Sequence, residues 1–298
     1  MKILIIGSEG FIGKHLVRYF STKHDVFGAD LLDIENSSYA YYKVSRMNPD
    51  YSRLFNNEKF DVCINAAGSG SVPESFRSPT NDFKANVIDT FSILNAISIH
   101  NNKCKFIYFS SAAVYGNPLT LPIKESDNVA PLSPYGWHKL LSENICKEFY
   151  AINGVKSTIL RPFSVYGPGL KKQIIWDLYQ KVKSSENITL YGTGSETRDF
   201  IYVKDLILSV DRIIEKAGFE CEIFNVASGT SISIDNLAKD FVKAGNFSNT
   251  VNFSDQEREG DPKFWRADIS KLSALGYNAG TSIIEGLKET IKWMKENE

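Results

Sequence analysis

The chain of 298 residues has little of several features that would place it in a specialised class. Its four cysteines, at positions 63, 104, 146 and 221, are far apart, so we expect reduced thiols rather than a disulfide framework or a zinc site. Its four histidines show no metal-ligand spacing. The 34 basic and 35 acidic residues nearly cancel, so no excess of positive charge favours nucleic acid as a partner.

Long apolar runs are also missing. No apolar stretch approaches the ~20 residues that a membrane-spanning helix needs. The sequence opens on a strand-like run and not on a charged and then apolar leader. With 43% hydrophobic and 23% charged residues, the composition is that of an ordinary globular enzyme. These features predict a cytoplasmic protein with no membrane partner.

What the sequence does have is a glycine turn at its start. A short β-branched run, residues 2–6, leads into Gly7-Ser8-Glu9-Gly10-Phe11-Ile12-Gly13, after which apolar residues recur at helical spacing. In a strand–turn–helix unit of this kind, Gly7 allows the tight turn and Gly10 lets the backbone approach a diphosphate. Gly13 allows the helix to pack closely on the strand. The pattern predicts a dinucleotide site at residues 7–13, with Phe11 and Ile12 among its residues.

Asp30 indicates which dinucleotide is bound. It ends a second strand-like run, 17 residues beyond Gly13, and is followed by Leu31 and Leu32 rather than by a basic residue. A carboxylate at this place accepts hydrogen bonds from a ribose diol and repels a 2′-phosphate. The sequence therefore favours NAD(H) over NADP(H).

A Tyr–Lys pair supplies the candidate chemistry. Tyr135 and Lys139 are four residues apart, so they project from one face of a helix. A nearby ammonium favours phenolate, so Lys139 is expected to lower the pKa of Tyr135 from its usual value near ~10. Ser111, at the end of an apolar run, can hydrogen-bond the same reacting oxygen. Together the three residues predict acid–base catalysis on an alcohol or ketone.

The order of strand-like and helical segments predicts an α/β fold. Strand-like runs recur at 2–6, 26–29, 61–65, 105–110 and 156–160 with helix-length segments between them, which indicates a Rossmann-type, doubly wound parallel sheet. One helix is expected over 83–99. Another is expected from Ser133-Pro134 to about Ile152, ended by Asn153-Gly154.

Two domains are expected from the same order. The alternation loosens beyond residue 169, so we expect an NAD-binding domain over 1–166 and a smaller α/β substrate lobe over 167–298. Elements near 198–227 are expected to return to the first domain.

The glycine turn, the segment from Ser111 to Gly116 and the Tyr–Lys pair together resemble the extended short-chain dehydrogenase/reductase family. The resemblance is to its nucleotide-sugar epimerases, dehydratases, decarboxylases and 4-ketoreductases. It extends through most of the chain, at residues 60–68, 86–87, 160–169, 192–205 and 258–262.

The resemblance implies a set of site residues and partners. Cofactor residues beyond the glycine turn would be Ala66, Ala67 and Pro162, together with Tyr135 and Lys139. Substrate residues would be Ser111, Ser164, Arg198 and Arg258, the two arginines holding a diphosphate through their fork geometry. The implied ligand is a UDP- or dTDP-linked sugar, the cofactor NAD, and the assembly a homodimer. No metal ligands are implied.

Three departures from the family pattern limit which of the family's reactions and ligand contacts this chain can share. Ala112 and Ala113 stand where family dehydratases carry an acid and a base, which argues against 4,6-dehydration. Ser164 stands where many members have a diphosphate-binding Asn. Residues 44–46 stand where relatives have an Asp near the adenine.

Three functions stay open from the sequence alone. The first is an NAD-dependent nucleotide-sugar 4-epimerase, favoured by Asp30. The second is an NAD(P)H-dependent 4-ketoreductase of a 4-keto-6-deoxy sugar, which the short chain favours slightly. The third is a non-enzymatic NAD sensor, which the presence of both Tyr135 and Lys139 disfavours.

Overall fold

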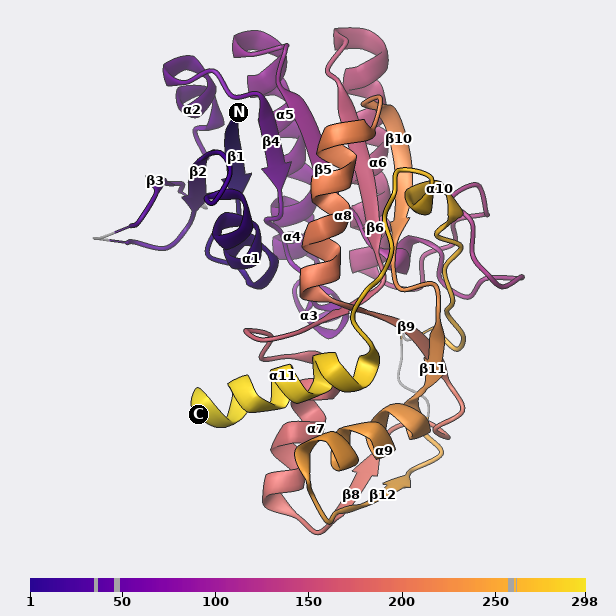
Figure 1. The fold of residues 1–298 in the computed structure, drawn as a ribbon. Helices are drawn as coiled ribbons and strands as arrows, with labels where there is room; N and C mark the ends of the chain where they lie inside the picture. The colour runs from indigo at the N-terminus through magenta and orange to yellow at the C-terminus, as the bar shows by residue number, and fades with distance from the viewer. Residues whose placement is uncertain (35–36, 46–48, 257–259, 261) are drawn as a thin grey trace. The chain divides into compact units, whose positions relative to one another are not determined.

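The computed structural model describes residues 1–34, 37–45, 49–256, 260 and 262–298 (Figure 1). The chain forms two compact units. The first comprises residues 1–116, 129–162 and 210–224, and the second comprises residues 117–128, 163–209 and 225–298. Of the segment near 198–227, residues 210–224 belong to the first unit.

A seven-stranded sheet forms the centre of the first unit. Its order is β10-β6-β5-β4-β1-β2-β3, and the paired strands from β6 through β3 run parallel. The order proceeds outward from β1 in both directions, which confirms the doubly wound Rossmann-type sheet. The bounds are β1 (Lys2–Ile6), β2 (Asp25–Asp30), β3 (Ala40–Lys43), β4 (Val62–Asn65), β5 (Lys105–Phe109), β6 (Ser157–Pro162) and β10 (Glu220–Val226).

Helices cover both faces of this sheet (Figure 1). They are α1 (Phe11–Phe20), α2 (Tyr51–Asn57), α3 (Val72–Arg77), α4 (Pro79–Phe83), α5 (Asp89–His100) and α6 (Pro134–Asn153). α2 packs on α5 and α5 packs on α6. α1 lies beside the later half of α8 (Val203–Lys216), where the Tyr19 hydroxyl donates to Asp211 at 2.6 Å.

The ends of α6 are where the sequence predicts them. Ser133 is the N-cap, and its hydroxyl accepts from the Gly136 N–H at 3.1 Å. Gly154 ends the helix in the left-handed conformation, with φ 68°. The single helix predicted over 83–99 is not continuous in the structure. A π-helical turn, Lys84–Ile88, separates α4 from α5.

An apolar core holds the sheet and helices of the first unit together. Leu4 and Phe106 of the strands pack with Ile93 and Leu94 of α5, all with no exposed surface. Burying each such side chain contributes about 1.5–3 kcal/mol. All four cysteines are free thiols, and burial raises the pKa of Cys63 and Cys146 well above the ordinary value.

The second unit is smaller and mixed. A three-stranded sheet has the order β11-β9-β7, and a two-stranded sheet pairs β12 with β8. Its strands are β7 (Ser164–Tyr166), β8 (Asn187–Leu190), β9 (Thr197–Tyr202), β11 (Ser231–Ser233) and β12 (Thr250–Phe253). Its helices are the first half of α8, α7 (Gln173–Ser184), α9 (Ile234–Gly245), α10 (Ser270–Ser273) and α11 (Ile283–Glu296).

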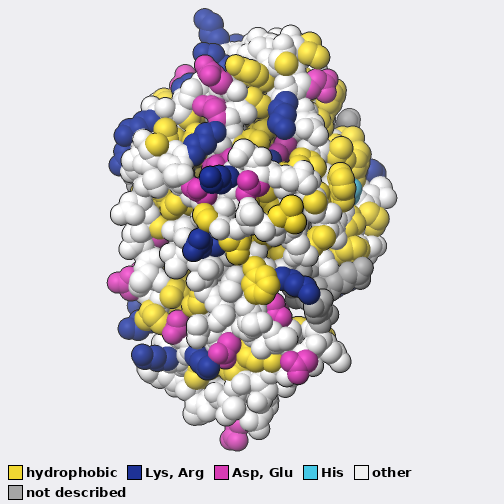
Figure 2. Space-filling view, turned by 90° about the vertical axis from the view of Figure 1, so that its right-hand side faces the viewer, with side chains coloured by type: hydrophobic (Ala, Val, Ile, Leu, Met, Phe, Trp, Pro, Cys, Tyr) yellow, Lys and Arg dark blue, Asp and Glu magenta, His cyan; other side chains and the backbone are white. Residues whose placement is uncertain are grey.

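Among the described residues, no helix is long and apolar enough to cross a membrane. On the face shown in Figure 2, basic and acidic side chains are scattered among hydrophobic and other polar ones.

Candidate active site

The glycine turn joins β1 to α1 by close backbone contacts. A Cβ at Gly13 would lie 1.9 Å from the Gly7 carbonyl oxygen, so only glycine allows this packing. A Cβ at Gly7 would lie 2.6 Å from the Ala67 nitrogen, which places Ala66 and Ala67 against the turn. Gly10, the N-cap of α1, has no side chain, so the first-turn N–H groups can meet a diphosphate. The turn therefore fits the diphosphate of NAD.

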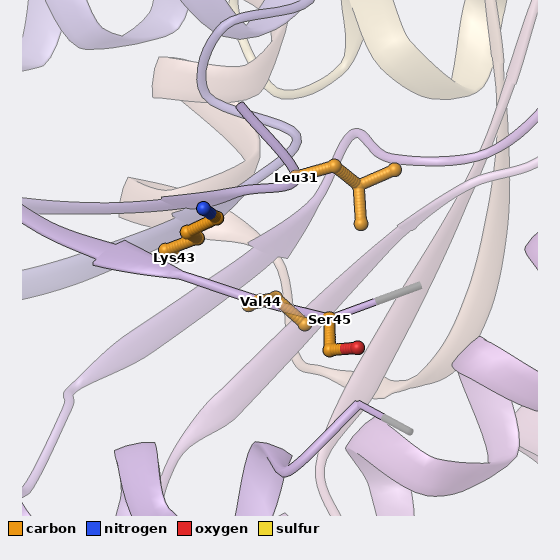
Figure 3. Close-up of a pocket in the computed structure, with 4 residues that line it drawn as sticks. All are labelled: Leu31, Lys43, Val44 and Ser45. Carbon is orange, nitrogen blue, oxygen red and sulfur yellow. The ribbon is translucent and has the colours of Figure 1, made fainter. Parts of the chain in front are cut away.

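Asp30 lies at the end of β2 beside this turn. Its Oδ2 accepts from the Glu9 N–H at 2.9 Å and its Oδ1 accepts from the Leu31 N–H at 2.6 Å. A hollow of about 440 Å³ opens next to it, lined by Leu31, Lys43, Val44 and Ser45 (Figure 3). Leu31 and Val44 give this hollow apolar surface beside a carboxylate, which suits an adenine and its ribose. Arg46, the last of the three departing residues, lies outside the described residues.

Ser111, Tyr135 and Lys139 come together in the first unit. A short 3₁₀ turn, Ala112–Val114, follows Ser111, and the Ser111 hydroxyl accepts from the Ala113 N–H at 3.1 Å. A Cβ at Gly136 would lie 2.8 Å from the Ala113 carbonyl oxygen, so Gly136 lets α6 approach this turn. The resulting contact includes a hydrogen bond between Tyr135 and Ser111.

Lys139 lies close to Tyr135 on the same helix. Its side chain is buried, and its ammonium donates to the Phe109 carbonyl at 2.8 Å. It lies 5.8 Å from the centroid of the Tyr135 ring. The α6 helix thus carries phenol and ammonium on one face, and β5 fixes the direction of the ammonium.

The pKa of Tyr135 moves in the opposite direction to the one expected from the sequence. Burial raises it to about 12, the hydrogen bond with Ser111 lowers it, and the charge of Asp82 raises it further. Burial thus outweighs the lowering of the pKa that was expected from Lys139. In the protein without cofactor, Tyr135 is a protonated phenol at neutral pH.

The remaining sequence-predicted residues lie as follows. Pro162 ends β6 in the first unit. Ser164 lies in β7 of the second unit and pairs with Phe200 of β9. Arg198 lies in β9, donates to the Thr197 carbonyl at 2.9 Å and lies 5.8 Å from the Trp265 ring. Arg258 lies outside the described residues.

Comparison with known proteins agrees with this geometry. Residues 3–227 match the model of the NAD dependent epimerase/dehydratase family. The chain belongs to this family. It is an NAD-dependent enzyme of the extended short-chain dehydrogenase/reductase class.

Three similar proteins of known or assigned activity match nearly the whole length of this epimerase/dehydratase-family chain. A putative UDP-glucose 4-epimerase of Methanocaldococcus jannaschii is 31% identical over 99% of both chains. The UDP-glucuronic acid 4-epimerase of Bacillus cereus, solved with UDP-glucuronic acid and NAD, is 29% identical with a TM-score of 0.92 over 100% of both chains. The UDP-N-acetylglucosamine 4-epimerase of Methanobrevibacter ruminantium is also 29% identical, with a TM-score of 0.91 over 100% of this chain and 99% of that one.

A buried ion pair lies behind the turn that carries Ser111. Arg161 donates to both carboxylate oxygens of Glu143, at 2.8 and 2.6 Å, and the Ser110 hydroxyl donates to Glu143 at 2.6 Å. Glu143 lies one turn after Lys139, and Ser110 directly precedes Ser111. The sequence did not predict this arrangement, because the partners of Glu143 lie 18 and 33 residues from it along the chain.

A second pair lies close to Tyr135. The Asp82 carboxylate is buried and lies 2.6 Å from Nδ1 of His138. Among the described residues, its other oxygen has no hydrogen-bond partner. No sequence signal links Asp82 to His138, because 56 residues separate them.

Proposed function

We propose that this enzyme inverts the configuration at C4 of a UDP-linked sugar. The observation that carries the proposal is the grouping of Ser111, Tyr135 and Lys139 in the unit that also holds the glycine turn. Support comes from relatives that are named as UDP-sugar 4-epimerases and that match this chain over 99–100% of their length. Ala112 and Ala113 lack the acid and base that 4,6-dehydration needs.

The proposed chemistry assigns each residue a task. Bound NAD would supply a reversible hydride acceptor for C4. Tyr135 would take the proton from the C4 hydroxyl as a phenolate and give it back after the 4-keto sugar has turned over. Because burial raises the pKa of the phenol without cofactor, the phenolate would form when the positive charge of the oxidised nicotinamide is bound beside it. Ser111 donates a hydrogen bond to the same oxygen. Lys139 places positive charge beside the phenol and favours its ionised form.

The C4 proposal also assigns residues to binding. Gly7, Gly10, Phe11, Ile12 and Gly13 would hold the cofactor diphosphate, with Asp30, Ala66, Ala67 and Pro162 completing its site. Ser164, Arg198 and Arg258 would hold the diphosphate of the substrate. Arginine suits this task because its planar fork matches two phosphate oxygens.

The test is a panel of sugar nucleotides with NAD far below the substrate concentration. We expect UDP-glucose, UDP-N-acetylglucosamine or UDP-glucuronic acid to convert to a mixture of C4 epimers, because the hydride returns in each cycle. The two epimers are separated by chromatography. Conversion of a 4-keto-6-deoxy sugar nucleotide only with stoichiometric NADH or NADPH would instead establish a 4-ketoreductase.

We further propose a homodimer. Ile88, Phe91 and Ile99 on the α5 side are 46%, 44% and 65% exposed, and Trp137 and Leu141 of the neighbouring α6 are 53% and 41% exposed. Such an apolar helix pair is typical of a subunit interface. Light scattering should give twice the 33.5 kDa chain mass, and a monomer mass would contradict the proposal.

The cytoplasmic location of the enzyme stays a prediction.

A further inference from the structure

Glu9 brings a second carboxylate to the adenosine end of the cofactor site. Its backbone N–H donates to Asp30 Oδ2 at 2.9 Å, so its side chain starts beside the group expected to meet the ribose diol. The Glu9 side chain is only 14% exposed. Its charge is therefore screened less than that of a surface carboxylate.

Tyr39 holds the Glu9 side chain in place. The Tyr39 hydroxyl donates to Glu9 Oε1 at 2.5 Å. Its ring packs against β2, where a Cβ at Gly28 would lie 2.2 Å from ring atom Cε2. Burial and the bond to Glu9 raise the pKa of Tyr39 to about 12, so it remains a proton donor to Glu9 at neutral pH.

Two lysines lie near this carboxylate, and both form exposed ion pairs that contribute little. Lys14 lies 3.3 Å from Glu9 Oε2, but its side chain is 62% exposed, and such pairs are weak. Lys43, which lines the neighbouring hollow, pairs with Asp33 at 2.5 Å. The charges of Glu9 and Asp30 both act on Tyr39 and Tyr41, which shows that the two carboxylates share one environment.

We propose that Glu9 is a second specificity-determining residue, which acts with Asp30 to reject the 2′-phosphate of NADP(H). A ribose hydroxyl can donate a hydrogen bond to a carboxylate, whereas a phosphate brings nearly two negative charges against it. Two carboxylates repel a phosphate more strongly than one. The inference rests on the NAD dependence of the enzyme and not on the identity of its sugar.

The test uses ADP-ribose and 2′-phospho-ADP-ribose, which differ only in the 2′-phosphate and lack nicotinamide. Calorimetry on the full chain compares wild type with Glu9→Gln, Asp30→Asn and the double variant. We expect Glu9→Gln to reduce the preference for ADP-ribose by roughly tenfold, with the affinity for ADP-ribose itself within about threefold of wild type. The double variant should lose more of the preference than either single variant.

Two control variants make the result specific to the Glu9 charge. Glu58→Gln removes another carboxylate of the first unit, one that pairs with Lys2 at 2.7 Å, and should leave the preference unchanged. Tyr39→Phe keeps the ring and the Glu9 charge but removes the hydrogen bond that holds the Glu9 side chain, so it should reduce the preference less than Glu9→Gln does. If Tyr39→Phe loses more of the preference than Glu9→Gln, the tyrosine hydroxyl and not the Glu9 charge sets the ratio of the two affinities, and the proposal is wrong.

A direct negative result is equally clear. Circular dichroism shows whether Glu9→Gln folds. If it folds and its ratio of affinities for ADP-ribose and 2′-phospho-ADP-ribose stays within about twofold of wild type, Glu9 plays no part in cofactor selection. Glu9→Ser is the substitute if Glu9→Gln does not fold, and an unchanged ratio in that variant has the same meaning. In either variant, a shifted ratio supports the proposal even if no sugar in the activity panel is converted.

Discussion

Tyr135 holds its proton firmly in the protein without cofactor, since burial raises its pKa to about 12. The proposed role requires this phenol to give and take a proton at the sugar oxygen. Tyr135→Phe should therefore lower turnover by about two to four orders of magnitude, the range for a positioned acid–base group. NAD affinity should change little, because the phenol would contact the reacting oxygen. Conversion of the preferred sugar nucleotide and NAD titration measure the two effects.

Tyr150→Phe is the matched control for this substitution, because Tyr150 lies on the same helix four turns from Tyr135. Its turnover should stay near that of wild type. A Tyr135→Phe enzyme that retains a third of wild-type turnover would remove Tyr135 from the mechanism.

Single residues also show where sequence reasoning reaches its limit. Local patterns were sufficient to identify the glycine turn and the Ser133 cap, because backbone geometry there depends on neighbouring residues. The pKa of Tyr135 was predicted in the wrong direction, because the burial of the phenol depends on the tertiary fold and not on the neighbouring residues. The pairing of Glu9 with Tyr39 crosses 30 residues and leaves no periodic signal.

Helix α6 is the element that links the proposed catalytic residues to the core. It carries Tyr135, Lys139 and Glu143, and the last of these binds Arg161 of β6 through a fully buried ion pair. Removing one partner of such a pair leaves an uncompensated charge. We expect Glu143→Ala to reduce the free energy of unfolding by about 3–5 kcal/mol. Urea denaturation followed by circular dichroism measures it.

Glu58→Ala provides the comparison, since Glu58 pairs with Lys2 through partly exposed side chains. That variant should lose less than about 1 kcal/mol. Equal losses in the two variants would show that burial of the Glu143–Arg161 pair does not determine its contribution.

The π-helical turn between α4 and α5 shows why one helix was predicted as continuous. The apolar period runs through both helices, so the sequence gives no sign of the break. In the structure, the Asn86 side chain donates to the Asp82 carbonyl at 3.1 Å. The Asn86 carbonyl accepts from Thr90 at 2.6 Å and from Ser142 of α6 at 3.0 Å. Side-chain hydrogen bonds, one of them from another helix, thus accompany the wider turn.

At the scale of the whole molecule, the two units are proposed to divide cofactor binding from substrate binding. Arg198 lies in the second unit, and a guanidinium contact to a diphosphate would persist through the reaction. Arg198→Ala should therefore raise KM and leave kcat nearer its original value. Calorimetry should show UDP binding weakened by roughly 1.5–3 kcal/mol, with NAD binding unaffected.

Arg258→Ala should behave in the same way. Arg212→Ala is the control, because Arg212 forms an exposed pair with Glu215 in the first unit. If both Arg198→Ala and Arg258→Ala bind UDP as tightly as wild type, neither arginine holds the substrate diphosphate.

The chain passes from one unit to the other at five points, after residues 116, 128, 162, 209 and 224. Helix α8 is shared, its first half in the second unit and its later half in the first. No single cut in the gene therefore yields either unit complete: a fragment ending at Pro162 lacks β10 and the α8 turn that binds Tyr19. If the second unit holds the substrate as proposed, substrate specificity cannot be exchanged between such enzymes by moving one continuous block of sequence, because that unit is built from three separate segments.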